Sequence, residues 1–155
     1  MTDAYAAVAA PQTVGSVDAG YLQTLLGYNA RRVSLLAIEL FTGRMAAYGL
    51  SPVDFSVLSL IRHNPGITSR QLCSALNLLP PNLVGKISLM EKRDLLQRKP
   101  HPGDGRAIGL YLTADGNQMM QQAENTTTEL EQEVSSKLTG AEAKTLLRLL
   151  QKVYL

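Results

Sequence analysis

The sequence predicts a mainly helical protein with a small β-hairpin wing, arranged as a winged helix-turn-helix with a helical dimerisation region. Three observations support this fold class. Apolar residues recur at helical spacing through much of the 155 residues. Three Ser/Thr capping boxes mark helix starts. A Pro- and Gly-rich stretch near residue 100 separates two short extended runs, as in a hairpin.

The first fifty residues divide into a tail and a long helix. Residues 1–17 are rich in small residues and show no sustained period, so we expect a mobile tail. From Asp18 an apolar series at helical spacing runs to Met45, with Asp18 as the N-cap and Gly49 as the stop. The sequence therefore predicts one long helix here.

Three short helices are expected next. Ser51 and Asp54 form a capping box with Pro at the first helical position, which opens a helix that ends near His63. A second capping box opens the helix Ser69–Leu76, and a third helix follows over Pro81–Arg93. Two short helices joined by a tight turn are typical of a helix-turn-helix.

A hairpin and two more helices complete the chain. Extended runs over 95–99 and 107–112 flank a six-residue loop, Pro100–Gly105. Thr113 caps a long helix, and a third capping box opens the last helix, which ends near Tyr154. We therefore divide the chain into a tail over 1–17, a dimerisation helix over 18–49, a winged helix-turn-helix over 51–112 and C-terminal dimerisation helices over 113–155.

The long terminal helices carry apolar stripes that so small a globule cannot cover. The last helix, for example, presents Leu146, Leu147, Leu150 and Val153. Paired helices from two copies would bury such stripes, so we expect a homodimer.

Charge is concentrated in the middle of the chain. Residues 62–106 hold eight basic and three acidic residues, whereas the whole chain has a net charge of only +2. A basic segment that contains a helix-turn-helix and a hairpin favours binding to double-stranded DNA. At the front of the second helix, Asn82 suits a bidentate contact with adenine, and Lys86 can reach guanine or a phosphate. The hairpin tip would then enter the minor groove beside it.

These residues resemble a known family. Asp104-Gly105-Arg106, followed by Leu110–Gly116, is similar to the Asp-x-Arg…Leu-Thr-x-x-Gly signature of the MarR family of transcriptional regulators. The stretch Leu89–Arg98 resembles the end of the family's recognition helix and its first wing strand. The resemblance implies an obligate homodimer that acts on a pseudo-palindromic operator, as a repressor released by a small ligand.

The resemblance also implies roles for the wing. Arg106 would lie at the minor groove, and Asp104 would orient the wing through a charge pair. Together with the basic segment, it leads us to expect DNA contacts from Ser69, Arg70, Pro81, Asn82, Lys86, Arg98, Lys99, His101, Asp104 and Arg106.

Three positions depart from the family pattern. Pro80-Pro81 replaces a helix start that usually contains Ser or Thr, which removes hydroxyl and N–H donors for phosphate. Asp94 stands where Gly is usual, a position whose left-handed turn Asp can adopt. Gly105 replaces a frequent Arg and weakens the charge of the wing.

Other classes of function find little support. One cysteine and two histidines cannot build a usual zinc site, and no cofactor motif is present. We expect Cys73 to be a buried, structural thiol. No catalytic constellation indicates an enzyme. No segment is long and apolar enough for a membrane, and no secretory signal is evident, so we expect a cytoplasmic protein. The alternative is a helical winged-helix module that binds another protein, without specific DNA binding.

Overall fold

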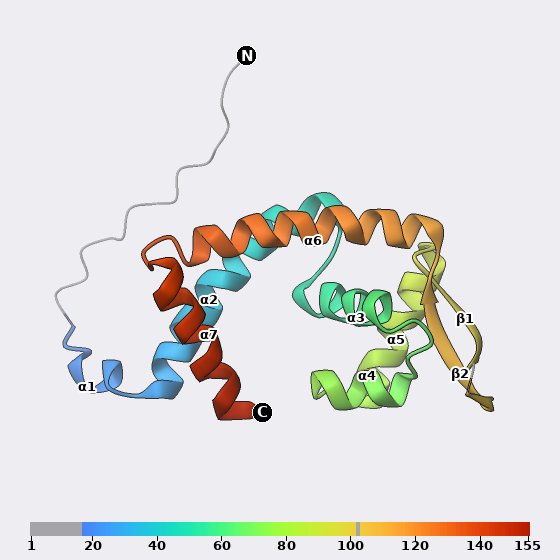
Figure 1. The fold of residues 1–155 in the computed structure, drawn as a ribbon, viewed down its shortest axis with the longest axis horizontal. Helices are drawn as coiled ribbons and strands as arrows, with labels where there is room; N and C mark the ends of the chain where they lie inside the picture. The colour runs from blue at the N-terminus through green and yellow to red at the C-terminus, as the bar shows by residue number, and fades with distance from the viewer. Residues whose placement is uncertain (1–16, 102) are drawn as a thin grey trace, which may run out of the picture. The chain divides into compact units, whose positions relative to one another are not determined.

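The computed structural model describes residues 17–101 and 103–155. The chain divides into two compact units, residues 1–35 and residues 36–155, and the boundary falls inside a helix. Nearly all of the tail predicted over 1–17 lies outside the described residues. Figure 1 shows a mainly helical chain with a single hairpin, which confirms the predicted fold class.

The first unit holds α1 (Gly20–Gln23) and the beginning of α2 (Leu26–Met45). The prediction of one long helix from Asp18 is wrong, because the helix is interrupted at Thr24 and Leu25. Apolar residues continue at helical spacing across the interruption, so the spacing alone could not predict the break.

Side chains satisfy the carbonyl groups that the interruption leaves without helical partners. The hydroxyl of Thr24 donates to the carbonyl of Tyr21 at 2.8 Å. The amide of Asn29 donates to the carbonyls of Gln23 and Leu25, both at 2.8 Å. Such local side-chain hydrogen bonds compete with the helical ladder and stabilise the break.

The second unit contains the end of α2 and all later elements (Figure 1). Along the chain these are a short 3-10 helix η1 (Ala46–Tyr48), α3 (Pro52–His63), α4 (Ser69–Leu76), α5 (Pro80–Lys92), β1 (Leu96–His101), β2 (Asp104–Leu112), α6 (Ala114–Val134) and α7 (Gly140–Tyr154).

All three predicted capping boxes are confirmed. In α3 the Ser51 hydroxyl accepts from the Asp54 N–H at 3.2 Å, while the Asp54 carboxylate accepts from the Ser51 N–H at 3.1 Å. The same reciprocal pattern starts α4 and α7. At the end of α4, Asn77 adopts a left-handed conformation with φ 50°. Asp94 does so after α5, with φ 54°.

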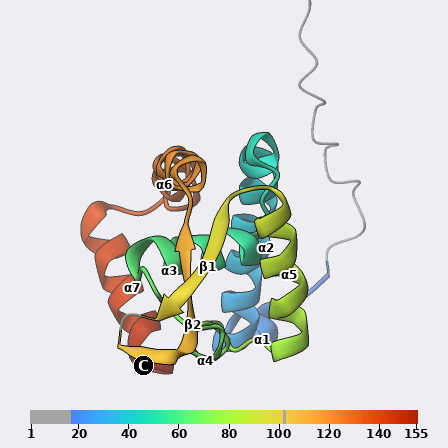
Figure 2. The same ribbon diagram turned by 90° about the vertical axis from the view of Figure 1, so that its right-hand side faces the viewer.

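The hairpin is longer and tighter than the sequence predicts. Antiparallel pairing runs from Leu96 opposite Leu112 to His101 opposite Asp104, with an irregularity after Pro100. The six-residue loop was therefore a wrong prediction, because both strands extend toward the tip (Figure 2). At the tip, the Gly103 N–H donates to Nδ1 of His101 at 3.1 Å, which helps to close the turn.

The junction between the hairpin and α6 is closely packed. The Thr113 hydroxyl accepts from the Gly116 N–H at 3.0 Å and lies 2.6 Å from the Asp94 carbonyl, to which it donates. A Cβ atom on Gly116 would lie 2.0 Å from the carbonyl oxygen of Leu95. This close approach explains why glycine is needed at the last position of the Leu-Thr-x-x-Gly signature.

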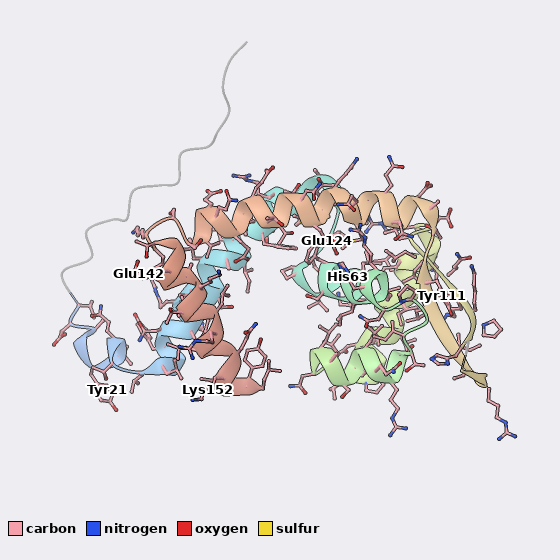
Figure 3. All side chains as sticks on the ribbon, viewed as in Figure 1. Tyr21, His63, Tyr111, Glu124, Glu142 and Lys152 are labelled. Atoms are coloured by element: carbon pink, nitrogen blue, oxygen red, sulfur yellow. The ribbon has the colours of Figure 1, made fainter. Side chains whose placement is uncertain are left out.

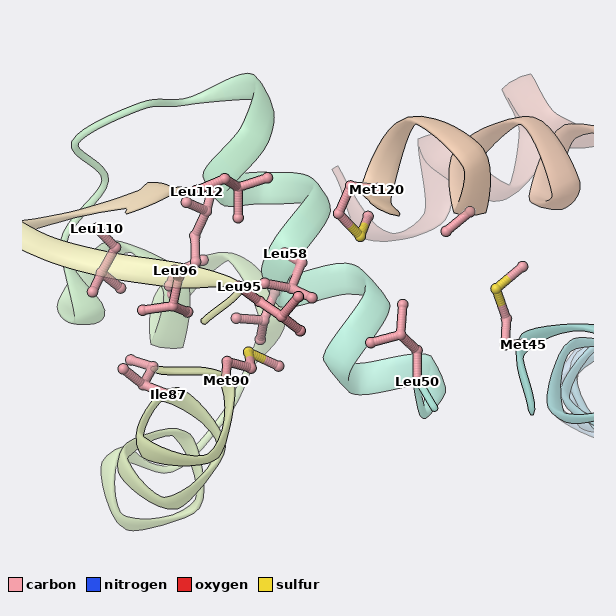
Figure 4. Packing of buried hydrophobic residues seen from close by; sticks show 14 of the residues in the cluster. Met45, Leu50, Leu58, Ile87, Met90, Leu95, Leu96, Leu110, Leu112 and Met120 are labelled. Carbon is pink, nitrogen blue, oxygen red and sulfur yellow. The ribbon is translucent and has the colours of Figure 1, made fainter. Parts of the chain in front are cut away.

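The hydrophobic core of the second unit lies where α3, α5, the hairpin and α6 meet. Figure 4 shows Leu58 of α3 close to Met90 of α5 and Leu95. The rings of Phe41 and Phe55 meet edge to face at 5.4 Å between centroids. The other buried members are Met45, Leu50, Val57, Ile61, Leu72, Leu83, Ile87, Leu96, Leu110, Leu112, Met120, Ala123 and Leu130.

Within the described residues, no single helix is long and apolar enough to cross a membrane. One pair of segments, Leu26–Tyr48 and Pro52–His63, passes a test of length and composition when taken together, with a bend of 67°. The second of these is α3, which supplies Val57, Leu58 and Ile61 to the protein core.

Candidate nucleic-acid interface

The helix-turn-helix consists of α4 and α5, within one residue of the predicted bounds. Arg70 is exposed near the start of α4, and Ser69 beside it is half-buried. Pro81 and Asn82 are exposed in the first turn of α5. These four predicted contact residues thus belong to the N-terminal turns of the two helices.

Lys86 of α5 is paired with an acidic side chain of α3. Its Nζ lies 2.8 Å from Oδ1 of Asp54, at the start of α3, and its side chain is half-buried. The Asp54 carboxylate also accepts from the hydroxyl of Ser51 at 2.6 Å. Burial raises the pKa of Asp54, but the hydrogen bonds from Lys86 and Ser51 together outweigh it and hold the pKa below its ordinary value. The ammonium group of Lys86 thus already has an anionic partner.

The cations of β1 also have partners on the protein. Arg98 forms a bidentate pair with Glu91 of α5, at 2.8 and 3.1 Å. The hydrogen bonds that Arg98 donates to Glu91 raise the pKa of Arg98 above its ordinary value. Lys99 is exposed, and its Nζ lies 5.5 Å from the ring centre of Tyr111. This cation–π contact costs Lys99 little of its access to solvent.

The remaining predicted residues lie around the hairpin tip. His101 is half-buried, and Arg106 is exposed on β2. The side chain of Asp104 lies outside the described residues, so its charge pair with Arg106 stays a prediction. The hairpin therefore places three cations, those of Arg98, Lys99 and Arg106, along its two strands.

The outward face of α5 is largely apolar, a feature that sequence reasoning missed. Leu83, Ile87 and Met90 point into the core, whereas Val84 and Leu89 are 57% and 54% exposed. Apolar residues of both faces are adjacent in the sequence, so the apolar pattern alone does not distinguish the inner face of α5 from the outer one.

A shallow apolar groove of about 230 Å³ lies between α4 and α5. Cys73 lines it and is half-buried, so the prediction of a buried thiol was only partly correct. Arg70 also lines the groove, and its side chain is otherwise exposed. The complete lining is Ser69, Arg70, Cys73, Pro80, Leu83 and Val84.

A polar network connects α3 to α6, and sequence reasoning missed it as well. The Glu124 carboxylate receives the guanidinium of Arg62 at 2.5 Å and the hydroxyl of Ser59 at 2.8 Å. Nε2 of His63 lies 3.0 Å from the same carboxylate, and Arg62 also donates to Gln121. Figure 3 shows His63 and Glu124 between the two helices. The network ties α3 to the helix that follows the wing.

A second connection joins α5 to the segment after α2. Arg93 donates to the carbonyls of Gly49 and Tyr48, at 2.9 and 2.7 Å. The hydroxyl of Tyr48 lies 3.0 Å from that of Thr126 on α6. The end of α5 is thus bound to the segment after α2, and that segment is in turn bound to α6.

Among the side chains that the structure describes, no three His, Cys, Asp or Glu groups are placed to hold a metal ion.

Comparison with known proteins agrees with this geometry. A sequence model of the MarR family matches residues 48–107, the helix-turn-helix and most of the wing. Among curated proteins, the chain is 28% identical over 130 residues to a putative transcriptional regulatory protein for the hcr operon of Thauera aromatica. That match covers 83% of this chain and 78% of its relative.

Solved structures of transcriptional regulators share the whole fold. The repressor CouR, bound to a 23-mer DNA duplex, is 31% identical with a TM-score of 0.83, covering 91% of this chain and 100% of CouR. CouR bound to p-coumaroyl-CoA is also similar, at 30% identity and a TM-score of 0.76 over 89% of this chain and 97% of CouR. A mutant of MarR from E. coli, complexed with operator DNA, is 26% identical with a TM-score of 0.77, over 90% of this chain and 100% of MarR.

Proposed function

Since the chain belongs to the MarR family of winged helix-turn-helix transcriptional regulators, we propose that it is a repressor that binds a pseudo-palindromic operator as a homodimer. Proteins of this family are DNA-binding regulators and not enzymes. The observation that carries the proposal is the likeness, over 91% of the chain, to a repressor bound to a DNA duplex.

The contact surface that we propose consists of the first turns of α4 and α5 together with the wing. Arg70 and Lys99 are exposed cations suited to phosphate, and Arg106 would reach into the minor groove. Asn82 is exposed at the front of α5, where its amide could pair with adenine. Ser69, Pro81 and His101 would complete the surface, with Asp104 orienting the wing. Lys86 and Arg98 would have to exchange Asp54 and Glu91 for phosphate before they could join it.

Exposed apolar side chains on the terminal helices support the homodimer. In α2, Val33 and Leu36 are about half exposed, and in α7 Leu147 and Val153 are 57% and 67% exposed. A monomer would leave these side chains in water at a cost of roughly 25 cal/mol per Å². Pairing with a second copy would remove them from water and would bring two helix-turn-helix units to one DNA site.

We also propose that a small molecule controls binding. CouR, which resembles this chain in both of its liganded structures, binds DNA in one and p-coumaroyl-CoA in the other. A ligand that favours one separation of the two α5 helices would release the operator, because half-sites lie about one helical turn apart.

The test is fluorescence anisotropy with the DNA that flanks the protein's own gene, at several salt concentrations. The proposal predicts tight binding that random duplex competes for poorly and that weakens steeply with salt. Arg106→Ala should weaken binding and make the dependence on salt less steep by about one unit of slope. If the protein binds random duplex as tightly as it binds every genomic fragment, the result would instead favour the alternative, a module that binds another protein.

A further inference from the structure

The outward face of α5 has a composition that favours one kind of base contact. In the first two turns of this helix the only cation is Lys86, and Asp54 holds it. The exposed residues there are Pro80, Pro81, Asn82, Val84 and Gly85, none of which is charged. An uncharged front on a recognition helix is poorly suited to guanine, which is read mostly by Arg or Lys.

The shape of this face allows a close approach to the floor of the major groove. A Cβ atom added to Gly85 would have no neighbour within 4 Å, so open space lies in front of the backbone at this point. Pro81 and Val84 are three residues apart and share a side of the helix, and Gly85 follows Val84 directly, one turn after Pro81. Because Gly85 has no side chain, this surface leaves room beside Val84 and Pro81 for a methyl group that projects from a base.

The cationic side chain of Arg70 beside this apolar face indicates that DNA binds there. Val84 lines the apolar groove between α4 and α5, and Arg70 lines the same groove. An apolar surface with a cation beside it matches the edge of a thymine next to its own phosphate. The 5-methyl group of thymine is the one apolar feature in the major groove, and the phosphate lies at its rim.

We infer that α5 reads the 5-methyl groups of thymines in the major groove through Val84 and Pro81, while Arg70 binds the adjoining phosphate. Asn82, on the same helix, is suited to adenine, so each half-site should contain A·T pairs opposite the front of α5. The inference rests on the proposed function, and it names the chemistry by which that function selects its DNA.

The experiment uses the full chain and a duplex selected from a randomised 30-base-pair library. Each thymine of the selected duplex is replaced in turn by deoxyuridine, which keeps the hydrogen-bonding edges and lacks only the methyl group. We expect at least one position in each half-site where the replacement weakens binding about fourfold, the factor that corresponds to one buried methyl group. This measurement needs no variant of the protein.

Val84→Ala assigns the contact. We expect this variant to bind the thymine duplex more weakly and to lose the deoxyuridine penalty at the contacted position. Leu89→Ala is the matched control, because Leu89 is equally exposed on the same helix but does not line the groove. It should keep the full penalty. Both positions are exposed, so both variants should fold, and circular dichroism checks this.

Three results would contradict the inference, and they are distinguishable. If the wild-type protein selects a sequence but tolerates deoxyuridine everywhere, thymine methyl groups are not read. If Val84→Ala keeps the fourfold penalty, the contact belongs to another residue. If selection enriches no sequence above random duplex, the proposed function itself fails, and this inference fails with it.

Discussion

The carboxylate of Asp54 joins α3 to α5, the second helix of the helix-turn-helix. It accepts from the N–H and hydroxyl of Ser51, which caps α3, and from Lys86 of α5, 32 residues away. One side chain therefore sets the start of α3 and tethers the middle of α5. Half-buried groups with several partners are costly to remove, because the partners lose their hydrogen bonds as well.

Asp54→Asn should lower the free energy of unfolding by about 1–2 kcal/mol at pH 7, measured by urea denaturation. Because the pKa of Asp54 is lowered in the folded state, the ionised carboxylate stabilises the fold above its ordinary pKa of 3.8. The advantage of the wild type should therefore persist at pH 5 and disappear as the pH falls through the folded-state pKa. Asp115→Asn in the first turn of α6 is the control, with an expected cost of a few tenths of a kcal/mol.

Lys86 and Lys99 should respond differently when each is changed to Gln. The Lys86 ammonium is neutralised by Asp54, whereas Lys99 is exposed on the wing. In a plot of log affinity for the selected duplex against log salt, Lys99→Gln should reduce the slope by about one, as expected for a lost phosphate contact. Lys86→Gln should leave the slope unchanged. A reduced slope for Lys86→Gln would mean that Lys86 exchanges Asp54 for a phosphate.

At the scale of elements, the orientation of the wing depends on close backbone packing at its base and along β2. Gly116, in the first turn of α6, lies against the carbonyl of Leu95 at the base of β1. Gly109 on β2 lies against the backbone of Gly66, where an added Cβ would be 2.8 Å from the Gly66 oxygen. The Gly66 N–H donates to the Leu110 carbonyl at 2.8 Å, which joins the α3–α4 turn to the strand.

Gly116→Ala should be severely destabilising, by about 3 kcal/mol or more, because its Cβ would overlap a buried carbonyl that cannot move freely. Thermal unfolding followed by circular dichroism measures the effect. Gly140→Ala is the matched control, since Gly140 also lies in the first turn of a helix and a Cβ there meets nothing within 4 Å. The control should melt at or slightly above the wild-type temperature. Equal melting temperatures for the two variants would refute this account of the junction.

At the scale of the whole molecule, the described helices leave many large apolar side chains exposed. They are concentrated in α1, α2 and α7, as opposed to the helix-turn-helix core. Large exposed apolar surfaces on soluble proteins often mark binding sites, which is why we propose that a second copy covers these side chains.

Leu147→Glu should weaken the proposed dimer, because it would bury an unpaired carboxylate in an apolar interface. Sedimentation at several concentrations should show a monomer where the wild type is a dimer, and affinity for a duplex with both half-sites should fall. Ile108→Glu on β2 is the control, as Ile108 is also about half exposed but lies on the wing. It should stay dimeric. A wild-type protein that sediments as a monomer at micromolar concentration would contradict the proposal.

The sequence by itself determined the features whose causes lie within a few residues. Capping boxes need only the residues from N-cap to the third helical position, so the starts of α3, α4 and α7 were predicted correctly. Asn77 and Asp94 adopt left-handed turns through their own short side chains. The break at Thr24 is local too, but its side-chain bonds leave no trace in the apolar spacing.

Only the tertiary structure decided which charges are engaged and which face of α5 is open. Lys86 meets an acid 32 residues earlier in the chain, and Arg62 meets Glu124, 62 residues later. Val84 and Leu83 are adjacent apolar residues, yet one is exposed and the other buried. These ion pairs and differences in burial depend on how the helices pack, because packing brings together residues that are far apart in the sequence. The sequence therefore predicts a DNA contact surface, and the packing determines which of the predicted side chains already have partners on the protein.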